Sequence, residues 1–203
     1  MCCRSLKSNR RCSRKLKRID TIGITPSVEN EITILKKIEI AIDRGMDALQ
    51  VRDKKINQKK FTETSKVIRK EFPKLFLIFN GKPEIAADIG FEGLHAPDSE
   101  PSREWIENYK ANSHLFLTAS IHNINSLEKF KNFKFDAALL SPVKNTPSKE
   151  KYLRPLGWEN FKLLAKKIKK PTYALGGMSI SDMEEAQRNG AQGLAMMGYF
   201  FNN

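Results

Sequence analysis

An amide and two basic side chains stand close together where an apolar run ends, in the segment LQVRDK. Gln50 and Arg52 are two residues apart, so both lie on one face if the segment is a strand. A guanidinium turned toward a protein interior is costly to bury unless an anion or an acidic partner offsets its charge. The spacing therefore predicts that Gln50 and Arg52 face a bound anion, with Lys54 just above them in the next loop. A salt bridge from Arg52 to an interior acid such as Asp136 is the alternative.

The segment SPVKNTPSK is rich in hydroxyl and amine groups, which suit an oxyanion such as phosphate or diphosphate. The candidate ligands in it are Ser141, Lys144, Thr146, Ser148 and Lys149. Two later apolar runs end in glycines, at Gly176-Gly177 and at Gly198, where backbone N–H groups can approach an anion closely. We interpret these segments together as an anion-binding region, with a polar surface loop as the alternative for the first of them.

Polar residues end three further apolar runs, at Asn80, at His95 and at Ser120, and His122 follows two residues after the last of these. An imidazole can carry a proton near neutral pH, which makes His122 a candidate for acid–base chemistry. A hydrogen-bonded structural histidine is the alternative interpretation of this residue.

Such residues need a scaffold that brings many strand ends together, and the chain alternates apolar β-rich runs with helical segments eight times. The predicted strands are Ile19–Thr25, Ala48–Asp53, Leu75–Asn80, Gly93–Ala96, Leu115–Ser120, Ala137–Ser141, Thr172–Gly176 and Gly193–Met197. Most are short and apolar on both faces, as buried parallel strands are. Eight such units favour an α/β fold of the (β/α)8 TIM-barrel type, with its site at the carboxyl ends of the strands. An open doubly wound sheet is disfavoured because no G-x-G-x-x-G turn follows the first strand.

Helical spacing supports the segments between the strands. Ile32, Leu35, Ile38 and Ile42 are predicted to share the buried face of the first helix. Ser181 is predicted to cap the helix DMEEAQRN, which Gly190 ends. Because few residues follow the eighth strand, we expect the final outer helix to be missing, which would favour self-association.

Charge is unevenly distributed along the 203 residues, whose formal net charge is +13. Eight of the 36 basic side chains fall within residues 1–18, which contain no acid. We predict a basic, disordered arm over residues 1–17 and a barrel over 18–203; a nucleic-acid tether is the less favoured reading of the arm. All three cysteines lie in the arm and no apolar run is long enough to cross a bilayer, so we expect a cytoplasmic protein without a membrane partner.

In these residues the chain resembles the thiamine-phosphate synthase/TenI family, over about residues 19–200. The family's Gln-x-Arg-x-Lys signature matches Gln50 to Lys54, its Asn after the third strand matches Asn80, and its Gly-Val-His resembles Gly93-Leu94-His95. Its Ser-x-His, Pro-Val…Thr-x-Thr-Lys and Ala-x-Gly-Gly motifs are similar to Ser120-Ile121-His122, Pro142-Val143…Thr146-Pro147-Ser148-Lys149 and Ala174-Leu175-Gly176-Gly177. The C-terminal third looks closest to the version of the domain that is fused to Nudix hydrolases.

The resemblance implies an enzyme of thiamine biosynthesis that joins hydroxymethylpyrimidine diphosphate to thiazole phosphate and releases diphosphate with the help of Mg²⁺. By this analogy Arg52, Lys54 and Lys149 hold the diphosphate and stabilise its developing charge. Gln50, Asn80 and Ser120 orient the pyrimidine. The remaining substrate-binding residues, which cradle the thiazole phosphate, are Thr146, Ser148, Gly176, Gly177, Met197 and Gly198.

The chain departs from the family pattern where that pattern has metal carboxylates. Gly81 replaces the Asp of the usual Asn-Asp pair, and the second Asp aligns with Glu100, with Asp98 two residues nearer. The TenI branch suggests an alternative, a thiazole phosphate carboxylate tautomerase in which His122 carries the proton. A third possibility is a barrel that binds thiamine phosphate or a nucleotide without catalysis. Phosphorylated pyrimidine and thiazole compounds are the expected partners, and nucleic acid is not expected.

Overall fold

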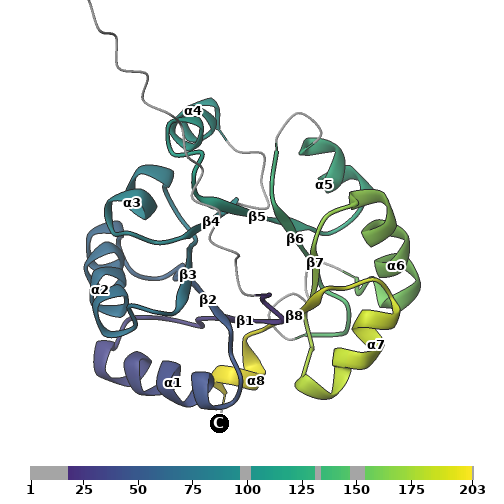
Figure 1. Ribbon diagram of the computed structural model, residues 1–203, viewed down its shortest axis with the longest axis horizontal. Coiled ribbons are helices and arrows are strands. Elements are labelled where there is room, and N and C mark those ends of the chain that lie inside the picture. The colour runs from purple at the N-terminus through teal and green to yellow at the C-terminus, as the bar shows by residue number, and fades with distance from the viewer. Residues whose placement is uncertain (1–17, 97–101, 131–133, 147–153, 203) are drawn as a thin grey trace, which may run out of the picture.

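The computed structural model describes residues 18–96, 102–130, 134–146 and 154–202. Within them, neighbouring strands pair in parallel and in chain order, and the last strand pairs with the first, so that the sheet closes into a barrel of eight strands. Helices surround the ring of strands in Figure 1. This architecture confirms the predicted (β/α)8 fold, whereas the predicted basic arm, residues 1–17, lies outside the described residues.

The strands lie where the apolar runs predict them. Their bounds are β1 Thr21–Ile24, β2 Ala48–Val51, β3 Phe76–Phe79, β4 Gly93–Ala96, β5 Phe116–Ile121, β6 Ala137–Leu140, β7 Thr172–Leu175 and β8 Gly193–Met196. Most predicted strands run past these bounds by one or two residues, such as Arg52 after β2 and Asn80 after β3. The Asn80 backbone N–H still donates to the Val51 carbonyl (3.0 Å), whereas that of Arg52 donates to the Thr25 hydroxyl (2.8 Å). Those same residues are the ones that rise above the barrel.

Inward-pointing side chains fill the barrel in layers. The layer near the amino ends of the strands is apolar and includes Ile22, Ala48, Ile78, Ala137 and Tyr173, each at most 1% exposed. The Tyr173 hydroxyl donates to the carbonyl of Ile19 (3.0 Å), and burial raises its pKa to about 12. This layer closes the floor of the barrel, so a ligand can enter only from the carboxyl ends of the strands.

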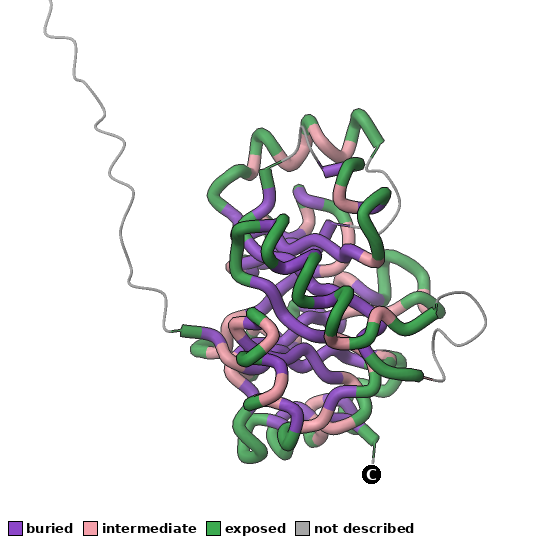
Figure 2. The backbone as a smooth tube through the Cα atoms, turned by 90° about the vertical axis from the view of Figure 1, so that its right-hand side faces the viewer, coloured by how far each residue is buried: buried purple, intermediate pink, exposed green. Residues whose placement is uncertain are grey.

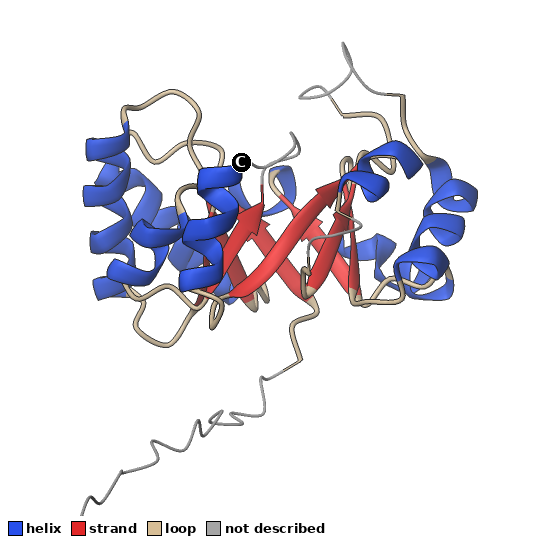
Figure 3. Cartoon of the chain, turned by 90° about the horizontal axis from the view of Figure 1, so that it is seen from above, coloured by secondary structure: helices blue, strands red, loops and turns tan. Residues whose placement is uncertain are grey.

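A second apolar core lies between the strands and the outer helices, and the buried segments, purple in Figure 2, run through the middle of the molecule. The helices, blue in Figure 3, flank the strands on both sides. Their bounds are α1 Glu31–Asp43, α2 Gln58–Glu71, α3 Pro83–Asp88, α4 Arg103–Ala111, α5 Ile124–Lys129, α6 Gly157–Ile168, η1 Ile180–Asp182 (a 3₁₀ turn), α7 Met183–Arg188 and α8 Gly198–Phe201. None of the helices in the described ranges is long and apolar enough to cross a membrane.

The predicted buried face of α1 is only partly correct, because Ile38 is buried and Leu35 packs against the core but Ile32 and Ile42 do not lie on the buried face. The helix buries Ile34, Ile38 and Ala41, whereas Ile32 is 71% exposed and Ile42 is 37% exposed. Isoleucines lie on several sides of this helix, so two different stripes with helical spacing compete. The stripe with the smaller Ala41 is the one that fits against the barrel.

Two predicted helix ends also need correction. Ser179, not Ser181, caps the turn after β7, because its backbone N–H and hydroxyl both donate to Asp182 (2.9 and 3.2 Å). The last outer helix is shortened to the single turn α8, with Phe200 and Phe201 buried. Lys37 on α1 donates to the carbonyl of Phe201 (3.1 Å), which holds this turn against α1.

Candidate functional site

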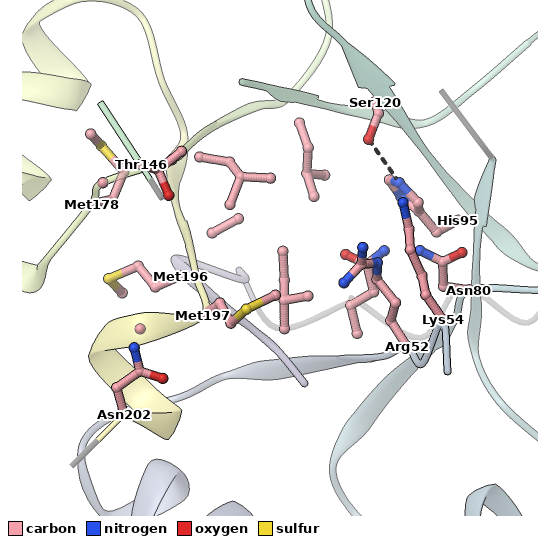
Figure 4. A pocket seen from close by; sticks show the side chains of 18 of the residues that line it. Arg52, Lys54, Asn80, His95, Ser120, Thr146, Met178, Met196, Met197 and Asn202 are labelled. Carbon is pink, nitrogen blue, oxygen red and sulfur yellow. Dashed lines mark hydrogen bonds between the residues drawn. The ribbon is translucent and has the colours of Figure 1, made fainter. Parts of the chain in front are cut away.

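A cavity of about 520 Å³ lies at the carboxyl ends of the strands, above the apolar floor. Most of the predicted site residues that the structure describes line it: Gln50, Arg52, Lys54, Asn80, Ser120, Thr146, Gly176, Gly177, Met197 and Gly198. Arg52, Lys54, Asn80, His95 and Ser120 lie on one side of the cavity, and Thr146 and Met197 lie on the other (Figure 4). We call the first set, with Gln50, the polar side, and the loops after β6, β7 and β8 the glycine side.

The polar side is positioned by the end of β2. Gln50 pairs in register with Ile24 on β1 and with Ile78 on β3, and it is 2% exposed. Arg52 follows outside the ladder, where its backbone N–H donates to the Thr25 hydroxyl (2.8 Å), which in turn donates to the Arg52 carbonyl (2.6 Å). This pair of bonds fixes the point at which Arg52 turns into the cavity.

The alternative partner for Arg52, Asp136, is excluded by its position. Asp136 is exposed and directly precedes β6, at the amino end of the barrel. Its carboxylate accepts from the backbone N–H of Leu117 (2.8 Å), near the beginning of β5. Arg52 leaves β2 at the opposite end of the barrel, so the two side chains do not meet.

Asp53, between the two basic residues of the motif, accepts hydrogen bonds from two loops. Its carboxylate accepts from the Ser27 hydroxyl (2.7 Å) and from the N–H groups of Val28 (2.8 Å) and Lys55 (2.7 Å). Burial alone raises the pKa of Asp53, but these hydrogen bonds outweigh burial and hold the pKa below its ordinary value. The charged carboxylate therefore ties the loop after β1 to the loop that carries Lys54.

We expect Asp53→Ala to lower the free energy of unfolding by about 2 kcal/mol at neutral pH, because it removes several hydrogen bonds to a charged group. A depressed native pKa contributes stability above the unfolded value of 3.8, and this contribution is lost as the pH falls through the native pKa. Urea unfolding at neutral pH and at about pH 3 should therefore show that the difference in free energy of unfolding between wild type and Asp53→Ala is smaller in acid. Exposed Asp43→Ala is the control, and a difference independent of pH would contradict this role.

A buried chain of hydrogen bonds, Thr118–His95–Ser120, reaches the cavity from β4 and β5, and we call it the relay. His95 is 4% exposed, and its Nδ1 and Nε2 lie 2.8 Å from the Thr118 hydroxyl and 2.9 Å from the Ser120 hydroxyl. Because the Thr118 hydroxyl donates to the Leu94 carbonyl (3.3 Å), we assign the ring proton to Nδ1, which leaves Nε2 to accept from Ser120. Ser120 then presents its oxygen lone pairs to the cavity and accepts from a ligand donor.

The glycine side is held together by an extension of the β6–β7 pairing. Val143 N–H donates to the Leu175 carbonyl (2.9 Å) and Lys144 N–H donates to the Gly176 carbonyl (3.1 Å). Gly177 has a φ of +68°, and a Cβ there would lie 2.7 Å from the carbonyl oxygen of Asn145. Only glycine fits this approach, which brings the two loops together beside the cavity.

The comparisons with known proteins agree with this geometry. A family model described as thiamine monophosphate synthase (TMP-TENI) matches residues 21–200. The chain belongs to this family. Among curated relatives, a putative thiamine-phosphate synthase 2 of Aquifex aeolicus is 27% identical, over 85% of this chain and 90% of the relative. A thiamine-phosphate synthase of Psychrobacter sp. is 24% identical over 81% of this chain and 78% of the relative.

Solved structures support the fold. The thiamine phosphate pyrophosphorylase from Pyrococcus furiosus superposes with a TM-score of 0.72 at 19% identity, covering 89% of this chain and 86% of that chain. At this identity the match shows that the family's barrel is shared. The closer resemblance to the version fused to Nudix hydrolases stays a prediction.

One family motif residue, His122, lies apart from the cavity. It does not line the cavity, although it immediately follows β5. Its Nδ1 donates to the Ser141 carbonyl (2.5 Å) and lies 3.3 Å from the Ser141 hydroxyl. These contacts link the end of β5 to the residue that follows β6.

Sequence reasoning missed several lining residues on both sides of the cavity. They are Ile24, His95, Leu139, Asn145, Leu175, Met178, Ala195, Met196 and Asn202. The period-two alternation that places Gln50 inside also places Ile24, Leu139, Leu175 and Ala195 on the inner face of their strands. His95 ends its strand and belongs to the Gly93-Leu94-His95 motif, but no role in the site was predicted for it, although the same alternation and its polar ring signal one.

The residues that were predicted to bind a metal ion lie outside the part of the chain that the structure describes. They are Asp98 and Glu100, and Ser148 and Lys149 lie outside it as well. Within the described ranges, no carboxylate lines the cavity and no group of three or more His, Cys, Asp or Glu side chains is placed to hold a metal ion. The described part of the site therefore does not fit Mg²⁺.

Gly81 has a packing reason to be glycine. A Cβ there would lie 2.5 Å from a ring carbon of Phe79. The Phe79 ring is fully buried and stacks on Phe61 (centroids 4.9 Å apart), with the edge of Phe91 at 5.6 Å. The Gly81 carbonyl accepts from the Trp105 indole N–H (3.1 Å), which fixes the turn from the other side.

We expect Gly81→Asp to lower the free energy of unfolding by about 1–3 kcal/mol, because a caged aromatic ring must move to admit the new side chain. The shorter Phe79→Leu side chain relieves this contact, so the same substitution should cost less in a Phe79→Leu background. Chemical denaturation of the four proteins in this cycle measures the coupling. Strictly additive effects would show that the Phe79 ring is not the obstacle.

Proposed function

We propose that this chain is a thiamine-phosphate synthase that joins hydroxymethylpyrimidine diphosphate to thiazole phosphate. The observation that carries the proposal is that one cavity has a cationic wall, with Arg52 and Lys54, facing a glycine-rich wall with Thr146 and Gly177. A synthase must hold two phosphorylated substrates together, whereas a tautomerase holds one. The names of the relatives and the family membership support the same reading.

On the polar side, Arg52 and Lys54 bind the diphosphate. As the bond between the pyrimidine methylene carbon and the diphosphate oxygen breaks, the leaving oxygen gains charge that these cations stabilise. Lys149, outside the described residues, is proposed as a third cation. Gln50, Asn80 and Ser120 orient the pyrimidine, Ser120 as an acceptor because its proton is directed to His95.

On the glycine side, Thr146, Ser148, Gly177 and Gly198 cradle the thiazole phosphate, with Gly176 shaping the turn. The apolar wall next to them contains Met178 and Met197, whose flexible thioethers pack well against aromatic rings. The thiazole nitrogen then forms the new C–N bond as the diphosphate departs with the electron pair of the broken C–O bond. Holding both rings in one cavity makes this displacement effectively unimolecular.

Magnesium is proposed only as a charge-neutralising ion for the diphosphate, held by Asp98 and Glu100. Mg²⁺ is usually bound through one or two carboxylates plus substrate phosphates. Because the described residues do not form its site, we assign no step of the reaction to it. A cytoplasmic location, self-association and the basic arm likewise stay predictions.

The tautomerase alternative is not supported by the geometry. Its proton carrier, His122, does not line the cavity and donates to the Ser141 carbonyl instead. For the same reason we propose a positioning role for His122 in place of the catalytic one implied by the resemblance.

The experiment that separates the reactions supplies both synthase substrates and, in a second tube, the thiazole phosphate carboxylate tautomer. Products are identified by mass spectrometry. We expect thiamine phosphate in the first tube and no isomerisation in the second. Isomerisation without thiamine phosphate would refute the synthase assignment, and ligand binding without any turnover would favour a non-catalytic barrel.

A further inference from the structure

Lys144, a cation of the predicted anion-binding loop, is paired with an acid. Its Nζ donates to Oδ1 of Asp182 in η1 (2.6 Å), with side-chain exposures of 43% and 11%. Neither residue lines the cavity. The ammonium is therefore bonded to Asp182 and does not line the cavity.

Asp182 is bonded on both oxygens. Its Oδ2 accepts from the backbone N–H of Ser179 (2.9 Å) and from the Ser179 hydroxyl (3.2 Å). Burial alone raises the pKa of Asp182, but the hydrogen bonds from Lys144 and Ser179 lower it overall. The charged carboxylate thus ties Lys144 to the segment that follows the Gly176-Gly177 turn.

The pair bridges the two loops that form the glycine side. Asn145 and Thr146, directly after Lys144, line the cavity, and so do the residues from Gly176 to Met178 that lead to η1. A Cβ on Gly177 would lie 2.9 Å from Cβ of Lys144, so the loops are already in contact beneath the ion pair. The pair therefore adds a side-chain link between the segments that carry Thr146 and Gly177, beside the backbone bond from Lys144 N–H to the Gly176 carbonyl (3.1 Å).

We propose that the Lys144–Asp182 ion pair is a latch that sets the spacing of the glycine side and so its affinity for a phosphate group. Lys144 is then a positioning residue and not an anion ligand. The inference deepens the proposed function, since the glycine side is where we place the thiazole phosphate.

Two substitutions separate a latch from a ligand. A latch predicts effects of the same sign on phosphate affinity, and a ligand predicts effects of opposite sign. Lys144→Met and Asp182→Asn both break a latch, so each should weaken phosphate binding by about tenfold, and the double variant should be no worse than either single variant. If Lys144 instead binds the anion, Asp182→Asn frees the ammonium and strengthens binding, while Lys144→Met weakens it.

The measurement is calorimetric titration of the full chain with inorganic phosphate. It is repeated in an Arg52→Gln background, which removes the main cation of the polar side. Lys144→Arg keeps the positive charge that pairs with Asp182, so its phosphate affinity should lie within about threefold of that of the parent. The exposed Lys162→Met and Asp43→Asn are matched charge controls and should leave affinity unchanged, and thermal melts confirm that each variant is folded.

The latch is overturned if Asp182→Asn binds phosphate as tightly as the parent or more tightly. An unchanged phosphate affinity in both single variants, or a parent that binds no phosphate, overturns it as well. In the synthase assay, the latch variants should raise KM for thiazole phosphate and leave KM for the pyrimidine diphosphate unchanged. If no variant and no parent makes thiamine phosphate, the proposed function fails, while the phosphate titrations still decide the latch.

Discussion

Replacing Arg52 with glutamine lowers the rate of thiamine phosphate formation by about a thousandfold, which is the largest single effect that we expect. Arg52 lines the cavity on the polar side, and its backbone is fixed by reciprocal hydrogen bonds to Thr25. By the proposed mechanism, its guanidinium stabilises the charge that the leaving diphosphate gains. A glutamine keeps much of the volume and a hydrogen-bond donor but loses the positive charge.

The measurement is kcat and KM for both substrates in wild type and Arg52→Gln. The affinity for thiazole phosphate should change little, because that substrate is placed on the glycine side. Lys162→Gln, an exposed lysine on α6, controls for the change in net charge. A loss of less than tenfold in kcat would mean that Arg52 does not stabilise the leaving group.

The second largest effect is expected at Ser120. Ser120→Ala should lower kcat/KM by about a hundredfold, because a buried site built to accept from the pyrimidine loses its acceptor. Its partner His95 is held by Thr118, which is 1% exposed and does not line the cavity. Thr118→Val removes the acceptor for Nδ1–H while keeping the shape, so the ring proton moves to Nε2 and Ser120 becomes a donor.

Thr118→Val should therefore lower kcat/KM by about tenfold although it does not touch the ligand, and it should have no further effect in a Ser120→Ala background. The tautomer itself is read from the ¹⁵N chemical shifts of the His95 ring. Independent effects of the two substitutions, or an unchanged tautomer in Thr118→Val, would contradict the relay.

The barrel and most of the cavity could be predicted from the sequence because they depend on local patterns. Short apolar runs define the strands, and period-two alternation places Gln50 and Arg52 on the inner face. The residues at the strand ends then meet because the sheet closes. The motifs and glycines after the sixth, seventh and eighth strands predict that Thr146, Gly177 and Gly198 lie on the opposite wall.

Features that depend on contacts between distant residues could not be predicted in the same way. The buried face of α1 is chosen by fit against the barrel, which helical spacing alone does not reveal. The ion pair of Lys144 with Asp182 and the hydrogen bond from His122 to the Ser141 carbonyl join residues that are far apart in the sequence, so motif spacing does not reveal them. The ring of Phe79 explains Gly81 only once both are placed in space.

The central claim is that one cavity joins two phosphorylated substrates, and diphosphate release tests it most directly. The 203-residue chain is mixed with hydroxymethylpyrimidine diphosphate, with or without thiazole phosphate, and diphosphate and thiamine phosphate are both quantified. We predict equal amounts of the two products when both substrates are present, and no diphosphate when thiazole phosphate is left out. Diphosphate release that is independent of thiazole phosphate, or no thiamine phosphate at high enzyme concentration, would contradict the account.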